Sequence, residues 1–184
     1  MGILGGTFDP VHNAHLAMAR AAARELPLEK LLWMPTGRPG YRQPPVAGAQ
    51  DRLAMLRLAI EGEARYAIDA RELDERATGF TVDTLKSLRR DFPKDEMFLL
   101  MGSDQYSKFE SWREPEEVAR LARLAVFARP GFQMENGFAA TVVAMPPLQV
   151  SASEIRSRVA RGEDISQLVP PPVAAYIARQ GLYR

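Results

Sequence analysis

Short apolar runs alternate with amphipathic segments along the whole chain. The runs are four to six residues long, which suits buried strands, and they occupy residues 1–5, 31–34, 66–69, 96–101, 124–128 and 141–145. Strands that alternate with helices predict an α/β domain. We therefore expect a Rossmann-like, doubly wound, mainly parallel sheet of five to six strands with helices on both faces.

Helical periodicity fills most of the segments between these runs. Apolar residues that recur every three or four positions predict helices with one buried face at about 14–26, 50–61 and 81–92. Further helices are predicted at about 115–123, 151–161 and 170–181. Pro27 and Pro93 stop two of these segments because proline cannot continue a helix. Gly62, Gly162 and Gly181 are placed as C-terminal caps.

Composition narrows the kind of protein. The 184 residues contain no internal repeat or linker, so we expect a single domain over residues 1–184. The 24 basic and 23 acidic side chains leave a net charge of +1, which argues against nucleic-acid binding. The absence of cysteine excludes disulfides and thiol catalysis. No apolar run approaches the ~20 residues of a membrane span. No signal peptide precedes the first strand, so we expect a soluble, cytoplasmic protein.

The first strand leads into a glycine-rich turn and then into a helix that begins with histidines. Residues 5–15 are Gly-Gly-Thr-Phe-Asp-Pro-Val-His-Asn-Ala-His. Glycines let backbone N–H groups approach a phosphate, and Thr7 adds a hydroxyl donor. His12 and His15 are the only 2 histidines of the chain, and their spacing places them on one side of a first helical turn. The segment predicts a phosphate-binding site.

This segment resembles the G-[TS]-F-D-P-x-H-x-G-H signature of the nucleotidyltransferase superfamily, with Ala14 in place of a glycine. The resemblance implies that the histidines contact ATP phosphates. It assigns to the ATP site Gly5, Gly6, Thr7, Phe8, His12 and His15. Asp9 is either a turn-stabilising side chain, which we favour, or a water-mediated metal contact. A zinc site is not favoured because no third and fourth ligand stands beside the histidine pair.

Two later segments resemble bacterial nicotinate-mononucleotide adenylyltransferases. Residues 79–85 match that family's Y-T-[IV]-D-T-L segment, although Thr81 as a helix N-cap would by itself explain the pattern. The resemblance implies that the backbone, Thr81 and Thr84 receive the pyridine carboxylate, and a helix N-terminus suits an anion. Trp112 is either a core residue, as is common for tryptophan, or the family's ring that stacks on the pyridine. Its polar neighbours favour stacking.

Candidates also follow the predicted strands. Gly102 and Asp104 match the family's G-[AS]-D, which implies that they bind ATP, with the acid placed to accept from ribose hydroxyls. The Pro- and Gly-rich loop 35–45 is either a plain connection or, at the ligand-facing edge of the sheet, functional. The family carries a phosphate-binding lysine there, and Arg42 is assigned to the mononucleotide in its place. Arg52 either reaches the phosphate region or, as we favour, is an ordinary solvated arginine.

A serine-rich helix start forms the last motif. Ser151 and Glu154 have the spacing of a capping box. Hydroxyls, free N–H groups and an arginine at one helix start also suit an anion. The segment resembles the family's I-S-x-T-x-I-R, which grips the triphosphate, so Ser151, Ser153 and Arg156 join the predicted ATP site.

With these motifs in matching order, the chain is identified as a member of the nicotinate-mononucleotide adenylyltransferase family. The resemblance implies transfer of the adenylyl group of ATP to nicotinate mononucleotide, giving deamido-NAD and pyrophosphate in NAD biosynthesis. The mononucleotide phosphate would attack the α-phosphorus in line, without a covalent intermediate. His12, His15 and Arg156 would be the catalytic donors. Mg²⁺ is expected on the ATP phosphates, and self-association is left open.

Two alternatives remain at this point. Transferases that act on phosphopantetheine or glycerol phosphate share the histidine signature, but they do not explain the segments around Thr84 and Trp112 or the late serine motif. A nucleotide-binding regulatory module without turnover belongs to a different class of protein. Pyrophosphate release from ATP with a panel of mononucleotides distinguishes these possibilities.

Overall fold

Six parallel strands form one sheet in the computed structural model, which describes residues 1–37, 44–128, 137–146 and 148–184. The strands are Gly2–Gly6 (β1), Leu31–Pro35 (β2), Tyr66–Ile68 (β3), Phe98–Gly102 (β4), Arg123–Phe127 (β5) and Ala140–Val143 (β6). They lie in the order β3-β2-β1-β4-β5-β6, and each described pairing is parallel. The chain winds outward from β1 in one direction and then in the other. This confirms the predicted doubly wound α/β fold.

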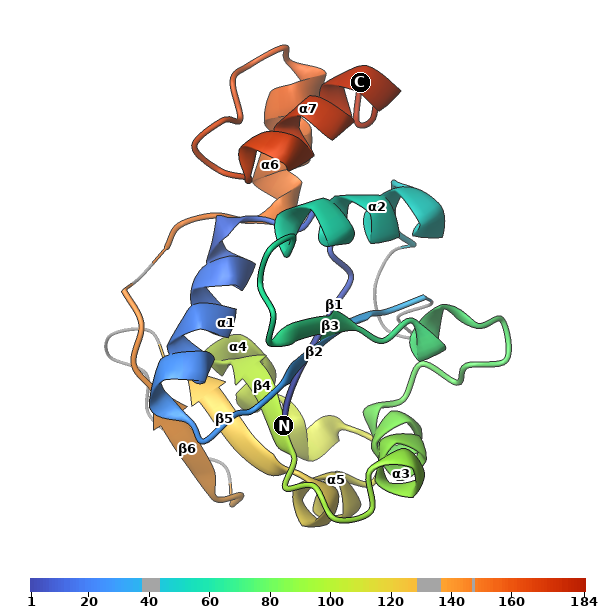
Figure 1. Cartoon of the computed structure of the whole chain (residues 1–184), viewed down its shortest axis with the longest axis vertical. Helices are drawn as coiled ribbons and strands as arrows, with labels where there is room; N and C mark the ends of the chain where they lie inside the picture. Colours follow the sequence, from blue (N-terminus) through green and yellow to red (C-terminus); the bar gives the residue numbers. More distant parts are fainter. Residues whose placement is uncertain (38–43, 129–136, 147) are drawn as a thin grey trace.

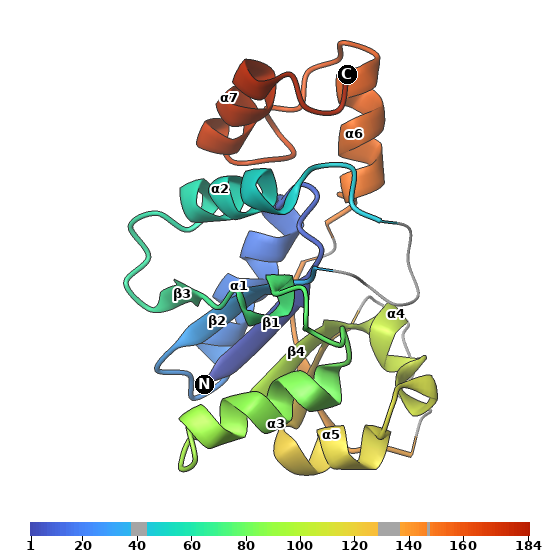
Figure 2. The same ribbon diagram turned by 90° about the vertical axis from the view of Figure 1, so that its right-hand side faces the viewer.

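Helices cover both faces of this sheet (Figures 1 and 2). One face carries α1 (Asn13–Glu25) and α2 (Ala49–Ala59), and the other carries α3 (Thr81–Asp91) and α5 (Pro115–Leu121). Coverage on both faces explains why the strand segments are continuous apolar runs rather than alternating ones. All five residues of β2, for example, are buried.

The end of the chain packs on its first half. Helices α6 (Ala152–Ala160) and α7 (Pro171–Gln180) lie together at one end of the molecule, beside α2 (Figures 1 and 2). Ile155, Val173 and Ile177 are each at most 2 % exposed and belong to the same apolar core as α1 and α2. This arrangement brings the C-terminal residues next to the turn that follows β1.

Alternating side chains of the strands supply two cores. Leu4 and Trp33 pack in the core with α1 and α2, whereas Ile3 and Leu32 pack in the core with α3 and α5. All four are at most 3 % exposed. The sheet is therefore fixed on both sides, and its carboxyl edge is a rigid platform for a site.

Three short elements have no counterpart among the predicted ones. They are α4 (Ser103–Tyr106) and the 3₁₀ turns η1 (Arg71–Leu73) and η2 (Phe109–Ser111). Each of these elements has only three or four residues, which is about one helical turn. The sequence therefore cannot show a repeat of apolar positions in them.

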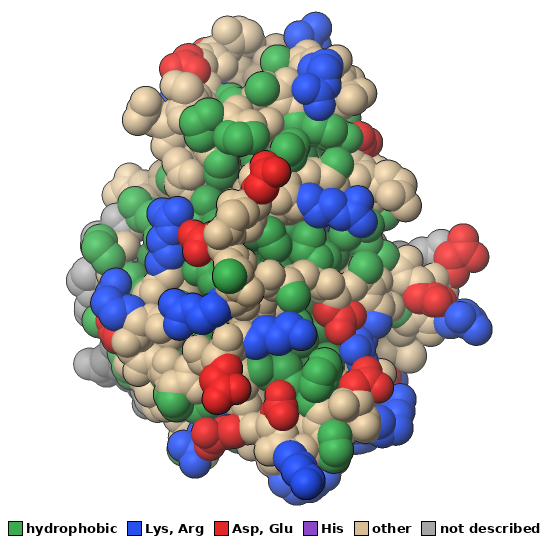
Figure 3. Space-filling view, viewed as in Figure 1, with side chains coloured by type: hydrophobic (Ala, Val, Ile, Leu, Met, Phe, Trp, Pro, Cys, Tyr) green, Lys and Arg blue, Asp and Glu red, His purple; other side chains and the backbone are tan. Residues whose placement is uncertain are grey.

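The surface carries charged side chains of both signs (Figure 3). None of the helices in the described part of the chain has the length and apolar character needed to cross a bilayer. Basic and acidic side chains are interspersed over the face seen in Figure 3.

Candidate nucleotide-binding site

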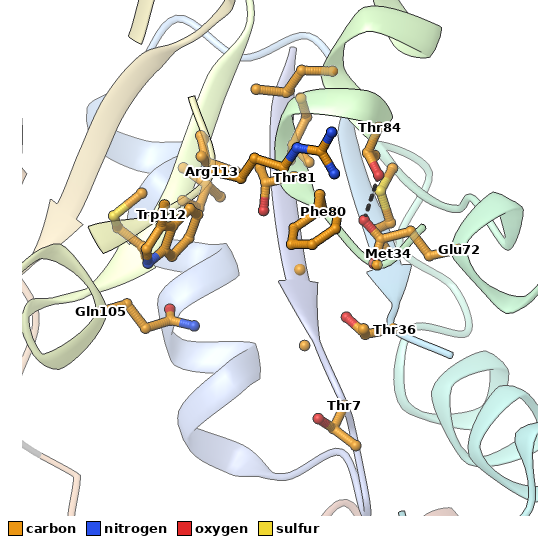
Figure 4. Close-up of a pocket in the computed structure, with 18 of the residues that line it drawn as sticks. Thr7, Met34, Thr36, Glu72, Phe80, Thr81, Thr84, Gln105, Trp112 and Arg113 are labelled. Carbon is orange, nitrogen blue, oxygen red and sulfur yellow. Dashed lines mark hydrogen bonds between the residues drawn. The ribbon is translucent and has the colours of Figure 1, made fainter. Parts of the chain in front are cut away.

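The winding of the sheet reverses between β1 and β4, and a cavity of about 430 Å³ opens there (Figure 4). Gly5 is the last but one residue of β1 and Gly102 is the last residue of β4, and a Cβ atom added to either would meet no heavy atom within 4 Å. In open α/β sheets, ligands bind in the crevice at such a switch point. The lining of this switch-point cavity includes Gly5, Gly6, Thr7, Thr36, Glu72, Thr81, Thr84 and Trp112.

The glycine-rich turn is shaped by the ring of Phe8. A Cβ atom on Gly6 would lie 2.9 Å from that ring, so a side chain at Gly6 would displace it. Phe8 has a left-handed φ of 50° and is only 1 % exposed. Its ring packs against His15 and Trp33, with centroids 5.0 and 5.5 Å away. Phe8 therefore supports the predicted ATP site from the core, through the His15 ring.

The two histidines meet at the start of α1. His12 is the N-cap residue, and its ring stacks on that of His15 with centroids 3.7 Å apart and an interplanar angle of 24°. The backbone N–H of His12 donates to Nδ1 of His15 over 3.2 Å. Because Nδ1 accepts, the neutral His15 ring carries its proton on Nε2. The structure thus confirms the predicted pairing of the two rings and makes Nε2 of His15 a donor.

Both histidines are neutral near pH 7 in the free protein. Burial lowers the pKa of His12 to about 4, and burial together with the neighbouring His12 lowers the pKa of His15 well below its ordinary value. His12 is 6 % exposed, and its Nδ1 has no hydrogen-bond partner within the described residues. A buried ring nitrogen without a partner is unfavourable, so this atom is suited to receive a ligand or water contact.

Asp9 joins the turn to two distant segments. Its carboxylate accepts hydrogen bonds from the backbone N–H groups of Val46 (2.8 Å) and Ala47 (3.1 Å) and from the hydroxyl of Tyr183 (2.8 Å). Asp9 is 4 % exposed. Asp9 thus does more than stabilise its own turn, which is the interpretation we favour from the sequence. Its hydrogen bonds also hold the loop before α2 and the C-terminal segment. In the described ranges, no group of three or more His, Asp or Glu side chains could hold a metal ion.

Two arginines bind the backbone of the same turn. Arg52 on α2 is 2 % exposed, and its Nη1 donates to the carbonyls of Thr7 (2.7 Å) and Thr36 (2.8 Å). Our interpretation of Arg52 as a solvated side chain is wrong, because these bonds draw it into the protein. Arg156 on α6 donates to the Asp9 carbonyl over 2.7 Å. The predicted anion-binding helix therefore lies against the turn that holds the histidines.

The start of α6 carries the other predicted serines. Ser151 is the N-cap residue and accepts from the backbone N–H of Glu154 over 3.2 Å, as predicted. Ser153 Oγ lies 3.1 Å from Ser151 Oγ. The Glu154 carboxylate accepts from Arg158 instead of closing the predicted capping box in the described structure. Both serines are exposed and do not line the switch-point cavity.

Three of the four predicted mononucleotide residues are brought together around the cavity. Thr81, Thr84 and Trp112 all line it, and in Figure 4 Trp112 lies across it from Thr84 and Glu72. Trp112 is half-buried and packs against Phe109, with ring centroids 5.3 Å apart. Trp112 is thus both an edge of the core and a wall of the cavity. The Thr84 hydroxyl donates to the Glu72 carboxylate over 2.7 Å.

The start of α3 differs from the prediction by one residue. The N-cap is Phe80, and Thr81 is already helical, so the predicted capping role of Thr81 is wrong. The Thr78 hydroxyl accepts from the Phe80 N–H (3.3 Å) and donates to Asp83 (2.6 Å), so it ties the segment before α3 to the first turn of the helix. The Thr81 side chain is consequently free of capping and faces the cavity (Figure 4).

Glu72 is a cavity residue that the sequence did not indicate. It lies on η1, and its carbonyl accepts from the Gly37 N–H over 3.1 Å. A Cβ atom on Gly37 would lie 2.4 Å from that carbonyl, so only glycine fits there. Burial raises the pKa of the Glu72 carboxyl. No motif in the sequence marks Glu72 as a site residue, because its partner Thr84 comes next to it only in the folded protein.

Gly102 and Asp104, like Phe8, the two histidines, the two serines and Arg156, are not part of the cavity lining. Gly102 ends β4, and Asp104 is exposed on α4. Both stand at the carboxyl edge of the sheet, next to β1. Arg42 lies outside the described residues.

The fold, the switch-point cavity and the glycine–histidine turn together define a nucleotide-binding α/β protein of the nucleotidyltransferase type. The model of the family described as cytidylyltransferase-like matches residues 3–158. The chain therefore belongs to the cytidylyltransferase-like family.

Curated relatives are similar over the full length of the chain. A protein of Chromobacterium violaceum named probable nicotinate-nucleotide adenylyltransferase is 41 % identical over 208 residues, covering 100 % of this chain and 98 % of that protein. One of Thermus thermophilus with the same name is 38 % identical over 185 residues, covering 100 % and 99 %. Among solved structures, the nicotinic acid mononucleotide adenylyltransferase of Plasmodium falciparum complexed with NaAD has a TM-score of 0.80 at 22 % identity, covering 99 % of this chain and 96 % of that one. At this low sequence identity, the similarity to the solved structure shows that the two proteins share a fold.

Proposed function

We propose that this protein is a nicotinate-nucleotide adenylyltransferase, which transfers the adenylyl group of ATP to nicotinate mononucleotide and releases pyrophosphate. The observation that carries the proposal is one cavity that joins two kinds of site. The Gly5–Thr7 turn leads from it to the stacked histidines, and Trp112 and Thr84 form its other walls. The full-length similarity to proteins of that name supports the same reaction.

On the ATP side, catalysis rests on placed donors rather than on a nucleophilic side chain. An oxygen of the mononucleotide 5′-phosphate attacks the α-phosphorus, and the bond from that phosphorus to the bridging β-phosphate oxygen breaks. His12, His15 and Arg156 stabilise the charge that develops on the α-phosphate and pyrophosphate. The histidines are neutral before ATP binds. The polyphosphate can therefore raise their pKa values, and each can become a stronger donor as charge develops.

Mg²⁺ enters as part of the substrate, bound to the ATP phosphates. The Asp9 carboxylate already accepts three hydrogen bonds, from Val46, Ala47 and Tyr183, so it is not a free ligand. The donor set of the site suits phosphate oxygens, and Mg²⁺ in such sites is commonly held largely by substrate phosphates and water. When bound, the ion neutralises charge on the polyphosphate.

On the mononucleotide side, the start of α3 meets the pyridine carboxylate. Its first backbone N–H groups and the Thr81 hydroxyl are donors at the positive end of the helix dipole. Asp83, the acid of this first turn, is engaged with Thr78 and does not line the cavity. Trp112 offers its ring to the pyridine, and Arg42 is assigned to the mononucleotide phosphate. We also propose that the enzyme works in the cytoplasm, where ATP is available.

The test is pyrophosphate release from MgATP with separate additions of nicotinate mononucleotide, nicotinamide mononucleotide, phosphopantetheine and glycerol phosphate. Release is expected above all with nicotinate mononucleotide. Release with phosphopantetheine or glycerol phosphate alone would assign another transferase. Binding of ATP without release in any mixture would indicate a regulatory module.

His15→Ala is the matched site variant for this assay. It removes one donor to the charge that develops in the transition state, and loss of such a donor typically lowers kcat by about 10²–10³-fold. The folded fraction is checked by thermal unfolding of both proteins. Parent-like turnover by His15→Ala would contradict the role proposed for this ring.

A further inference from the structure

The carboxylate of Asp9 gathers the phosphate-binding turn, the loop before α2 and the C-terminus at one point. Its two oxygens share three donors: Oδ1 accepts from Ala47 and Tyr183, and Oδ2 accepts from Val46. Arg156 Nη1 lies 3.8 Å from Oδ2 and donates to the Asp9 carbonyl. Asp9 stands only three residues before His12, so the contacts of its carboxylate anchor the chain close to the two histidines.

Tyr183 is placed for this contact by the end of α7. Gly181 is the C-cap with φ 64°, and the Leu182 N–H donates to the Ile177 carbonyl over 3.1 Å. Tyr183 itself has a left-handed φ of 66°, a conformation that costs free energy for a bulky residue. The reversal turns its side chain into the core, where it is 9 % exposed. Burial beside Asp9 raises the pKa of this hydroxyl, so it remains a donor.

We infer that Tyr183, the penultimate residue, is a positioning residue of the active site. Its hydroxyl holds Asp9, and Asp9 holds the turn that presents the two histidines to ATP. The inference rests on the proposed function. A small displacement of groups that must meet the α-phosphate lowers the rate without removing a catalytic group.

Tyr183→Phe tests this role, because it removes only the hydroxyl. Tyr176→Phe is a matched control on the same C-terminal segment, since the Tyr176 hydroxyl also donates to an aspartate, Asp51, over 2.9 Å. Asp51 lies on α2 outside the turn and the cavity. The readouts are kcat, the KM values of both substrates, thermal stability and the NMR signals of the imidazoles. The chain has only 2 histidines, so those signals report on the site alone.

We expect Tyr183→Phe to lower kcat about ten- to a hundredfold, to leave the KM for nicotinate mononucleotide unchanged, and to shift the imidazole signals. Tyr176→Phe should retain the parent kcat and the parent signals even where its stability falls. In an Asp9→Ala background, Tyr183→Phe should lower kcat little further, because the acceptor of the tyrosine hydroxyl is already absent.

Parent-like kcat and imidazole signals in Tyr183→Phe would overturn the inference, as would equal losses in both tyrosine variants. Independent, additive losses with Asp9→Ala would also overturn it. If the parent itself released no pyrophosphate with nicotinate mononucleotide, the proposed function would fail. The imidazole signals of the two tyrosine variants, which need no turnover, would then decide the inference.

Discussion

At the scale of single residues, the neutral state of the histidine pair has a consequence for stability. Burial lowers the pKa of His12 from 6.5 to about 4, and that of His15 is lowered as well. At pH values between about 4 and 6.5, the histidines of the unfolded chain bind protons that the histidines of the folded chain do not bind. The free energy of unfolding must therefore fall as the pH decreases from about 6.5 towards 4.

The expected slope is at most about 1.4 kcal/mol per pH unit for each histidine. Urea unfolding at pH 7, 6 and 5 measures it, and the variant His12→Gln should give a flatter dependence because it has one fewer titrating ring. A parent whose stability does not change over this range, or a variant with an equally steep dependence, would show that the rings are not buried in their neutral form.

Trp112 has a separate role that kinetics can isolate. As a wall of the cavity it is expected to contact the pyridine ring, and loss of base–aromatic stacking is typically worth about 1–3 kcal/mol. Trp112→Ala should therefore raise the KM for nicotinate mononucleotide about five- to a hundredfold and change the KM for ATP little. Because Trp112 also packs on Phe109, the thermal unfolding of Trp112→Ala is compared with that of the parent protein. Reduced stability with both KM values unchanged would assign Trp112 to the core alone.

At the scale of elements, α2 fixes the two loops that border the cavity. Its buried Arg52 donates to the carbonyls of Thr7 and Thr36, which follow β1 and β2 respectively. These bonds connect α2, which covers one face of the sheet, to the phosphate-binding turn. The helix thus orders the two loops at the border of the site.

Arg52→Met removes the donors and keeps an apolar stem of similar length, leaving two loop carbonyls without this partner. Hydrogen bonds to charged groups contribute about 1.5–3 kcal/mol. We expect a loss of about 2–4 kcal/mol in the free energy of unfolding, measured with urea. The control Arg57→Ala changes an exposed arginine of the same helix and should stay within about 0.5 kcal/mol of the parent. Equal effects of the two substitutions would contradict the role given to Arg52.

At the scale of the whole molecule, the sheet and its main helices were predictable because they rest on local periods and on contiguous motifs. Polar contacts between distant segments were not. Glu72 meets Thr84, Arg52 meets Thr7, and Tyr183 meets Asp9 only after folding, across 12, 45 and 174 positions of the chain. The start of α3 was misplaced by one residue for a related reason, since either Thr78 or Thr81 could serve the helix start by pattern alone.

The choice between nicotinate and nicotinamide depends on two opposed features of the cavity. The start of α3 favours a carboxylate, whereas the Glu72 carboxylate disfavours one. The Glu72 carboxylate already accepts a hydrogen bond from the Thr84 hydroxyl, which offsets part of its negative charge. An amide would also have to bury an N–H group against helix donors, which costs about 1–3 kcal/mol. The balance favours nicotinate by about tenfold to several hundredfold.

An internal competition measures this preference and the reaction together. The protein is given MgATP with equal concentrations of nicotinate and nicotinamide mononucleotides, and the two dinucleotide products are separated and quantified at early times. Their ratio equals the ratio of kcat/KM for the two substrates. We predict deamido-NAD in at least about tenfold excess over NAD. Equal amounts or an excess of NAD would contradict the assignment of the pyridine pocket, and the absence of both products would contradict adenylyl transfer itself.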